Sequence, residues 1–130
     1  MIGLSSPETG QRVFVATLGS DFIGFICLLE NYSNEYLLLD NLHVSAKAQG
    51  KGIGKKLIYY ALNSLNLEND KGLSLEVLKA NNKAIGFYTS LGGIQIHSQI
   101  WLAPCGTKVE EYVYQWPSIE ILKCRLKGQG

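Results

Sequence analysis

The 130-residue sequence lacks an excess of charge of either sign, a long apolar run and a leader-like N-terminus. Its formal net charge of +1 gives no electrostatic case for binding nucleic acid or an anionic membrane surface. No apolar run reaches the roughly 20 residues that a membrane-spanning helix needs. No basic region followed by a hydrophobic one opens the chain, so we expect no signal peptide. We therefore expect a cytoplasmic protein with neither nucleic acid nor membrane as a partner.

Cysteine is scarce as well, and its spacing does not indicate a metal site. Cys27, Cys105 and Cys124 are odd in number and far apart. We interpret them as reduced, structural thiols of a cytoplasmic protein, and we expect no metal. The remaining composition, with 46% hydrophobic residues, 18% charged residues and 14 glycines, is typical of a soluble folded domain. We therefore expect a single domain over residues 1–130, with a core at about 12–116.

The spacing of apolar residues predicts a mixed α+β fold. Strands are expected at residues 12–18, 22–30, 36–44, 73–78, 94–102 and 109–116. One helix is expected from Ile53 to an end within 68–72, and a second from a cap at Asn81 or Asn82 to a glycine cap after Leu91. The order is thus β-β-β-α-β-α-β-β, antiparallel at both ends and parallel in the middle. Residues 1–10 are expected to be loose, and the tail from Glu120 short.

The turn at residues 42–56 carries the strongest chemical signal. Within Gly50–Lys55, three glycines alternate with two lysines and an isoleucine, where a strand ends and a helix begins. Glycines let a backbone approach a ligand closely, and the first turn of a helix offers free N–H groups to an anion. The pattern predicts a phosphate or pyrophosphate site, although a tight turn without a ligand also explains it. It is not a Walker A loop, because no Gly-Lys-Ser/Thr ending is present, and its G-x-G-x-G spacing is a poor dinucleotide fingerprint.

Two segments resemble a known family. Gln49–Gly54 is similar to the Gln/Arg-x-x-Gly-x-Gly/Ala signature of the GNAT N-acetyltransferase superfamily. Val77–Gly92 resembles that family's second pattern, Val-x3-Asn-x2-Ala-x2-Phe-Tyr-x2-Leu-Gly. The two segments have the family's separation and element order, and the resemblance spans about residues 12–116. It implies a GNAT-like mixed sheet with a splayed central parallel pair, and acetyl-CoA (coenzyme A) as co-substrate.

The resemblance implies roles for the turn and for the strand before it. The turn would hold the pyrophosphate of acetyl-CoA through residues Gln49, Gly50, Lys51, Gly52, Ile53, Gly54 and Lys55. Leu42, His43 and Val44 would pair through their backbones with the pantetheine arm, as if the arm were another strand. Such pairing requires a gap between the strand at 36–44 and the strand at 73–78.

The second segment would complete the coenzyme site and supply the general acid. Asn81 would bond the pantetheine or phosphate arm, and Ala84 would also belong to the coenzyme site. Tyr88 would stand near the thioester sulfur. A phenol with a pKa near ~10 is a reasonable proton donor to a thiolate whose conjugate acid has a pKa of about 8.5 to 10. The alternative interpretation of Tyr88 is a core aromatic packed by Ala84 and Leu91.

The base is less well indicated than the acid. Asp40 precedes Leu42 by two residues, so regular alternation predicts that both side chains lie on the same side of the strand. A carboxylate there could take an amine proton, and a solvated or capping Asp40 is the other interpretation. Glu76 and His43 are weaker candidates, His43 being better explained as a partly buried, hydrogen-bonded histidine. His97 has no supporting context.

The sequence departs from the family in three places. The first hairpin begins about ten residues from Met1, so the strand and helices that precede it in the family are expected to be missing. The chain would then be a fragment, a natural truncation or a domain completed by a partner subunit. Gly93 follows Leu91 and Gly92 where the family usually has Phe, and Gln49 replaces the commoner Arg.

Our leading hypothesis is an acetyl-CoA-dependent N-acetyltransferase that acts on a primary amine of a small molecule or a protein. The amine would attack the thioester directly, without a covalent enzyme intermediate. Two alternatives stay open: a non-catalytic coenzyme A-binding module, and a partial domain completed by a partner subunit such as a second copy in a homodimer. A fourth and remote hypothesis is that the turn binds a nucleotide.

Overall fold

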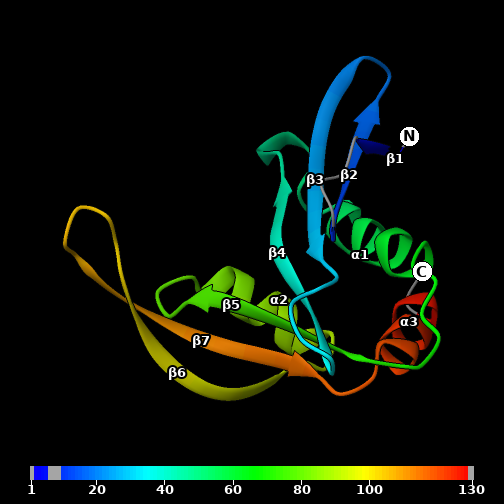
Figure 1. The fold of residues 1–130 in the computed structure, drawn as a ribbon. Helices are drawn as coiled ribbons and strands as arrows, with labels where there is room; N and C mark the ends of the chain where they lie inside the picture. The colour runs from blue at the N-terminus through cyan, green and yellow to red at the C-terminus, as the bar shows by residue number, and fades with distance from the viewer. Residues whose placement is uncertain (1, 6–9, 129–130) are drawn as a thin grey trace.

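The computed structural model describes residues 2–5 and 10–128, which form one twisted sheet with helices packed on it (Figure 1). The seven strands lie in the order β1-β2-β3-β4-β5-β7-β6. None of the described helices is both long and apolar enough to cross a membrane. In chain order the elements are β1 (Ile2–Ser5), β2 (Gln11–Leu18), β3 (Asp21–Leu29), β4 (Tyr36–Val44), the 3-10 helix η1 (Ala46–Ala48), α1 (Ile53–Asn63), β5 (Gly72–Leu78), α2 (Asn82–Ser90), β6 (Ile94–Leu102), β7 (Lys108–Trp116) and α3 (Ile119–Gly128).

The predicted α+β class and the predicted parallel centre are confirmed. β4 and β5 pair in parallel, and every other neighbouring pair of described strands is antiparallel. α1 provides the crossover between them and buries one face, made of Leu57, Ile58, Ala61 and Leu62. The helix ends at Asn63, earlier than predicted, where the Ser64 hydroxyl donates a hydrogen bond to the Ala61 carbonyl at 2.7 Å.

The predicted gap in the sheet is present between β4 and β5. The register joins only three residue pairs, Tyr36 with Gly72, Leu37 with Leu73, and Leu38 with Ser74. Glycine is needed at position 72, because a Cβ there would lie 2.6 Å from the Trp116 carbonyl oxygen. Beyond Leu38, β4 continues to Val44 with β3 on one side, and none of the described strands pairs with it on the β5 side. The two strands therefore open into a V.

Both ends of α2 have the predicted caps. The Asn81 side chain accepts a hydrogen bond from the Ala84 N–H at 3.2 Å. At the other end Gly92 has a φ of +88°, and the N–H of Gly93 bonds the Tyr88 carbonyl at 3.0 Å. This is the Schellman arrangement, in which a left-handed glycine satisfies the last carbonyls of a helix. The caps hold Tyr88 at a defined place on the last turn of α2.

Two elements correct the sequence analysis. Ile2–Ser5, expected to be loose, forms β1 and pairs antiparallel with β2, so a strand does precede the first hairpin. The remainder of the segment expected to be loose, residues 6–9, lies outside the described residues.

The tail is not a short extension but helix α3. The hydroxyl of Ser118 accepts a hydrogen bond from the Ile121 N–H at 3.1 Å, and Asp70 accepts one from the Glu120 N–H at 3.2 Å. Three of its side chains complete the core: Ile119, Leu122 and Leu126. The core thus extends past the expected limit at Trp116.

Candidate functional site

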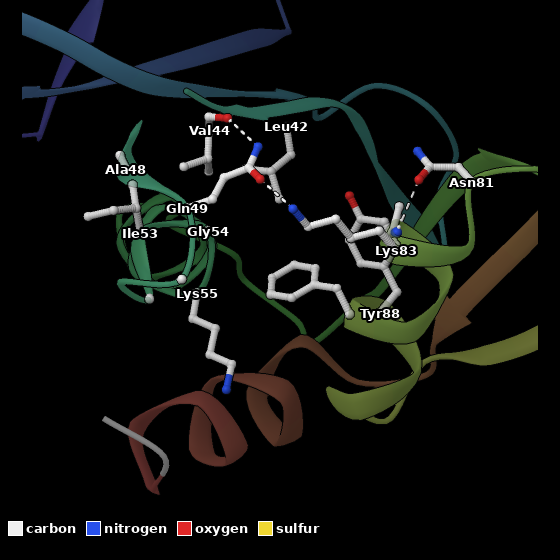
Figure 2. Close-up of a pocket in the computed structure, with 14 residues that line it drawn as sticks. Leu42, Val44, Ala48, Gln49, Ile53, Gly54, Lys55, Asn81, Lys83 and Tyr88 are labelled. Atoms are coloured by element: carbon white, nitrogen blue, oxygen red, sulfur yellow. Dashed lines mark hydrogen bonds between the residues drawn. The ribbon is translucent and has the colours of Figure 1, made fainter. Parts of the chain in front are cut away.

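A cavity of about 610 Å³ lies where β4 separates from β5 (Figure 2). It is bounded by the end of β4, the turn that follows, the start of α1, and α2. The side chains and glycines that line it are Leu42, Val44, Ala48, Gln49, Gly50, Gly52, Ile53, Gly54, Lys55, Asn81, Lys83, Ala84, Phe87 and Tyr88. Both segments that the sequence analysis singled out therefore meet in one pocket.

A β-bulge in β4 decides which side chains of that strand face the pocket. Cys27 of β3 lies opposite Asn41 and Leu28 lies opposite Leu39, so Asp40 is the extra residue. The bulge shifts the alternation: Leu39 and Leu42 both contact the core, whereas Asp40 and Asn41 are exposed. The prediction that Asp40 shares the side of Leu42 is therefore wrong, because it assumed an unbroken strand.

The turn between β4 and α1 has the properties of an anion cradle. Gly50 and Gly52 have φ values of +81° and +76°, a left-handed conformation that other residues rarely adopt. α1 begins after Gly52 with no side-chain cap and no acidic residue in its first turn. Its first N–H groups and the positive end of its dipole are thus left for a ligand. At Gly54 a Cβ would lie 3.2 Å from Phe87 Cζ, so glycine permits α1 and α2 to approach closely.

A chain of hydrogen bonds crosses the pocket from α2 to β4. The Lys83 ammonium donates to Gln49 Oε1, and Gln49 Nε2 donates to the Val44 carbonyl at 3.1 Å (Figure 2). This chain places a positive charge beside the glycine turn. The second lining lysine, Lys55, extends from the start of α1 toward α3 in the same view.

Tyr88 lies deep in the pocket. Its side chain is 8% exposed, and its ring has edge contacts with Phe87 and Trp116, at centroid distances of 5.3 and 6.1 Å. Figure 2 shows the hydroxyl directed toward β4. Burial raises the pKa of Tyr88 from 10.0 to about 12. Tyr88 is therefore both a core aromatic and a neutral hydroxyl donor that faces the cavity.

The opposite face of the sheet carries a group of acidic residues next to the same gap. Glu76 lies on the side of β5 away from the core. Partial burial, the charge and hydrogen bond of Glu111, and to a smaller extent the charge of Asp40 raise the pKa of Glu76. Gln99 acts against this shift by donating a hydrogen bond to Glu76 at 2.9 Å, and it also donates to Glu111 at 3.4 Å. The last residue pair that joins β4 to β5 is Leu38 with Ser74, and Asp40 and Glu76 each lie two residues beyond it on their strands.

Most of the predicted coenzyme residues line the pocket, and two do not. His43 is exposed and has a tilted ring contact with Phe25 at 5.8 Å, so the expectation that it is partly buried is wrong. Lys51 is exposed on the turn and is not part of the lining. His97 is also exposed, on β6.

Three lining residues were missed: Ala48, Lys83 and Phe87. A signal for two of them was present, because Lys83 is adjacent to the predicted site residue Ala84 and Phe87 is adjacent to the predicted site residue Tyr88 on the same helix. Their spacing by four residues places both on one helical face. Ala48 is the last residue of the 3-10 helix η1, which the sequence analysis did not predict. In the described part of the chain, no group of three or more His, Cys, Asp or Glu side chains could hold a metal ion.

Comparisons with known proteins show the family and the fold of the chain. The family model described as "Acetyltransferase (GNAT) family" matches residues 4–93. The streptothricin acetyltransferase of Streptomyces lavendulae is 30% identical over 91 residues, which are 69% of this chain and 48% of that protein. The chain thus spans about half the length of this curated relative.

Solved structures show the same fold. The smu.2055 protein of Streptococcus mutans has a TM-score of 0.72 at 21% identity, with 86% of this chain and 72% of that chain covered. Arabidopsis thaliana NAA60 in complex with acetyl-CoA has a TM-score of 0.70 at 18% identity, with 82% and 76% covered. Because the family model covers more than two thirds of the sequence and includes the whole glycine turn, the chain belongs to the acetyltransferase (GNAT) family.

Proposed function

We propose that the protein transfers an acetyl group from acetyl-CoA to a primary amine of a small molecule or a protein. The observation that carries this proposal is that an unpaired strand edge, an uncapped helix start and the hydroxyl-bearing ring of a largely buried tyrosine line one pocket. These features fit an amide-bearing arm that ends in a pyrophosphate at one end and a thioester at the other. We take residues 1–130 to act as one domain, located in the cytoplasm, where its free cysteines would stay reduced.

The binding of the coenzyme would use mainly backbone groups. The edge of β4 at Leu42–Val44 would pair with the amides of the pantetheine arm, because strand addition supplies hydrogen bonds without special side chains. The turn from Gln49 to Lys55 would hold the pyrophosphate, and Lys83 would add a positive charge beside it. Ala84 lies in the lining, and Asn81 would donate from its amide nitrogen, since its oxygen already caps α2.

When bound, acetyl-CoA would supply a thioester whose carbonyl carbon accepts the amine and whose sulfur leaves as a thiolate. A backbone N–H of Leu42–Val44 would polarise the carbonyl, a contribution of typically about 3 to 4 kcal/mol. Tyr88 would donate a hydrogen bond to the leaving sulfur. With its pKa at about 12, the phenol is a weaker acid than a thiol of pKa about 8.5 to 10. Complete proton transfer would be uphill by roughly 3 to 5 kcal/mol, so we propose that Tyr88 acts chiefly as a hydrogen-bond donor.

The amine would approach from the acidic face of the sheet. Asp40 and Glu76 flank the point where β4 and β5 separate, and Glu111 lies beside Glu76. Their carboxylates would attract a cationic amine and take its proton. Asp40 is the base that the family resemblance implies. Glu76 is the second candidate, because its raised pKa brings it closer to the value that a base needs near neutral pH.

Calorimetric titration with acetyl-CoA tests the coenzyme site. Gly52→Asp would place a carboxylate in the cradle and should abolish the micromolar binding expected of the unmodified chain. Gly19→Asp is the matched control, because Gly19 also has a positive φ and open space but lies in the β2–β3 turn. Equal loss in both variants, or no binding by well-folded unmodified protein, would contradict the proposal.

A further inference from the structure

Gln99 differs from the rest of β6 in its burial and in its contacts. Eight of the nine residues of β6 are exposed, and Gln99 is the half-buried one. Its side-chain amide Nε2 donates a hydrogen bond to Glu76 Oε2 at 2.9 Å and another to Glu111 Oε1 at 3.4 Å. One side chain therefore connects three strands that lie side by side, β5, β7 and β6 (Figure 1).

The strand register explains how Gln99 reaches both carboxylates. Gln99 lies directly opposite Glu111 in the β6–β7 pairing. In the β5–β7 pairing Glu111 lies opposite Leu78, and Glu76 precedes Leu78 by two residues, so it lies on the same face. Neighbouring residues on one face of a sheet are close enough for long side chains to meet across a strand. The contact is therefore a consequence of the sheet pairing itself.

The other titratable groups near Glu76 are mostly acidic. Glu111 faces it from β7 and Asp40 lies across the gap on β4. His97, two residues from Gln99, is the titratable residue on the same face of β6. Partial burial raises the pKa of Glu76, and Glu111, through its charge and hydrogen bond, and Asp40 raise it further, whereas the hydrogen bond from Gln99 lowers it. Gln99 thus favours the ionised form of a carboxylate that its acidic neighbours disfavour.

Lys79, the cation closest to Glu76 in the sequence, does not serve as its partner. The Lys79 ammonium pairs with Glu110 at 3.4 Å and lies over the ring of Tyr112, which packs against the core on the other face of the sheet. A neutral amide has a different effect from an ammonium: it orients a carboxylate without repelling a cationic amine, and it lowers the basicity of that carboxylate less. Gln99 therefore suits a carboxylate that has to receive a proton.

We propose that Gln99 is a positioning residue for acetyl transfer, whose amide holds the Glu76 carboxylate ionised and in a fixed orientation beside the opening between β4 and β5. This inference rests on the proposed function, in which Glu76 is one of two candidate bases. In the step that Gln99 supports, an N–H bond of the ammonium breaks, its electron pair stays on nitrogen, and an O–H bond forms on Glu76. The nitrogen then attacks the thioester carbon, the C–S bond breaks, and the second N–H proton ends on the leaving thiolate.

Two substitutions of Gln99 separate positioning from a purely structural role. Gln99→Met removes the donor at similar length, so the acidic limb of the pH–kcat profile should move to higher pH, with a loss of about threefold or more below the limb and an unchanged plateau. Gln99→Lys supplies a charged donor, so the limb should move to lower pH. Loss of a merely structural contact would lower the stability of both variants and shift the limb in neither.

Matched controls carry the same substitutions on the opposite face of β6. Gln95→Met removes an amide that accepts a hydrogen bond from the Tyr114 hydroxyl at 3.4 Å, and Ser98→Lys adds a positive charge opposite Tyr112. Neither side chain faces Glu76, so the acidic limb should stay in place in both variants. Shifts as large as those of the Gln99 variants would overturn the proposal, because the effect would then be one of composition or net charge.

A second measurement separates the failure of this inference from the failure of the proposed function. Carbon-13 NMR titration of the free protein follows the Glu76 carboxyl without any substrate, and Glu76→Gln identifies its signal. The pKa of Glu76 should rise in Gln99→Met and fall in Gln99→Lys. An unchanged Glu76 titration in both variants overturns the inference even where acetyl transfer is observed.

The two measurements together assign every other outcome. If Glu76 titrates as expected but the limb of the pH–kcat profile stays in place, Glu76 is not the base and the catalytic role of Gln99 is overturned. If the well-folded unmodified protein transfers no acetyl group, the proposed function fails, and this inference fails with it whatever the titration gives. Opposite shifts in both measurements, with both controls unchanged, support the inference.

Discussion

Lys83 of α2 and Gln49 of the glycine turn are hydrogen-bonded across the mouth of the pocket. The two residues lie 34 positions apart in the sequence, and their contact joins the two segments that resemble the family. Gln49 also bonds the Val44 carbonyl, so the same side chain ties the turn to the end of β4. The glutamine that stands in place of a commoner arginine thus recruits a positive charge from another element.

Lys83→Gln should weaken the binding of acetyl-CoA by about tenfold to a hundredfold, because hydrogen bonds to charged groups contribute roughly 1.5 to 3 kcal/mol. Titration calorimetry measures the affinity, and the difference between the two proteins should shrink at high salt. Lys79→Gln is the control, since Lys79 pairs with Glu110 outside the pocket. An affinity equally reduced by both substitutions would indicate a general charge effect.

Tyr88→Phe should lower kcat by about 10² or more and change KM little, because the hydroxyl would act on the leaving sulfur rather than on binding. Steady-state rates of thiol release measure both constants. Tyr114→Phe is the control, because it removes the hydroxyl of another buried tyrosine. This hydroxyl donates a hydrogen bond to Gln95 at 3.4 Å and does not line the pocket, so its removal should leave kcat unchanged. A Tyr88→Phe enzyme of normal rate would leave Tyr88 as a packing residue only.

Tyr88 should also make stability depend on pH in the alkaline range. The folded-state pKa of Tyr88, about 12, lies above the value of 10.0 for an unperturbed tyrosine. Its contribution to stability is therefore complete below pH 10 and is lost as pH rises toward 12, because the unfolded chain releases this proton first. Relative to Tyr88→Phe, the unmodified protein should lose about 1.4 kcal/mol by pH 11. Urea unfolding at several pH values measures this loss, and a constant difference between the two proteins would contradict a pKa raised by the burial of Tyr88.

Glu111→Gln should move the acidic limb of the pH–rate profile to lower pH. The charge and hydrogen bond of Glu111 help to raise the pKa of Glu76, so their removal lowers it, and a base with a lower pKa stays deprotonated in more acidic solution. Glu110→Gln, which changes the neighbouring residue paired with Lys79, should not shift the limb. If Glu111→Gln leaves the limb in place while Asp40→Asn removes it, Asp40 is the base and Glu76 is not.

Leu122→Ala should destabilise the fold by about 2 to 5 kcal/mol, because the side chain is 2% exposed within the main core. Ile121→Ala, at a position 70% exposed on the same helix, should stay within about 0.5 kcal/mol of the unmodified protein. Denaturant unfolding measures both. Similar small changes would mean that α3 contributes little to the core.

The sequence was informative where local chemistry determines the structure. β4 has the bounds predicted from its apolar run, Asn81 caps α2, and Gly92 ends that helix in the left-handed conformation. The residues of the glycine turn line the same pocket as Asn81 and Tyr88, so the two segments that resemble the family lie together. These features depend on neighbours in the chain, or on spacing that a family pattern records.

The features that were missed depend on contacts distant in the sequence. The bulge at Asp40 depends on the pairing of β4 with β3, and an aspartate at that position does not by itself indicate a bulge. β1 is short and gains its structure by pairing with β2. α3 had a readable signal, since Ile119, Leu122 and Leu126 are spaced by three and four, and Ser118 and Asp70 supply its start.

The short pairing of β4 with β5 has a mechanical consequence. In the described part of the sheet, three residue pairs between β4 and β5 connect the strands β1–β4 to the strands β5, β7 and β6, and the pocket lies where β4 and β5 then separate. A ligand whose arm bonds along β4 and whose other side contacts α2 would bridge the same boundary. The bound substrate would then connect the two halves of the sheet as well as react. With the substrate bound, the two halves of the protein would unfold more cooperatively than without it.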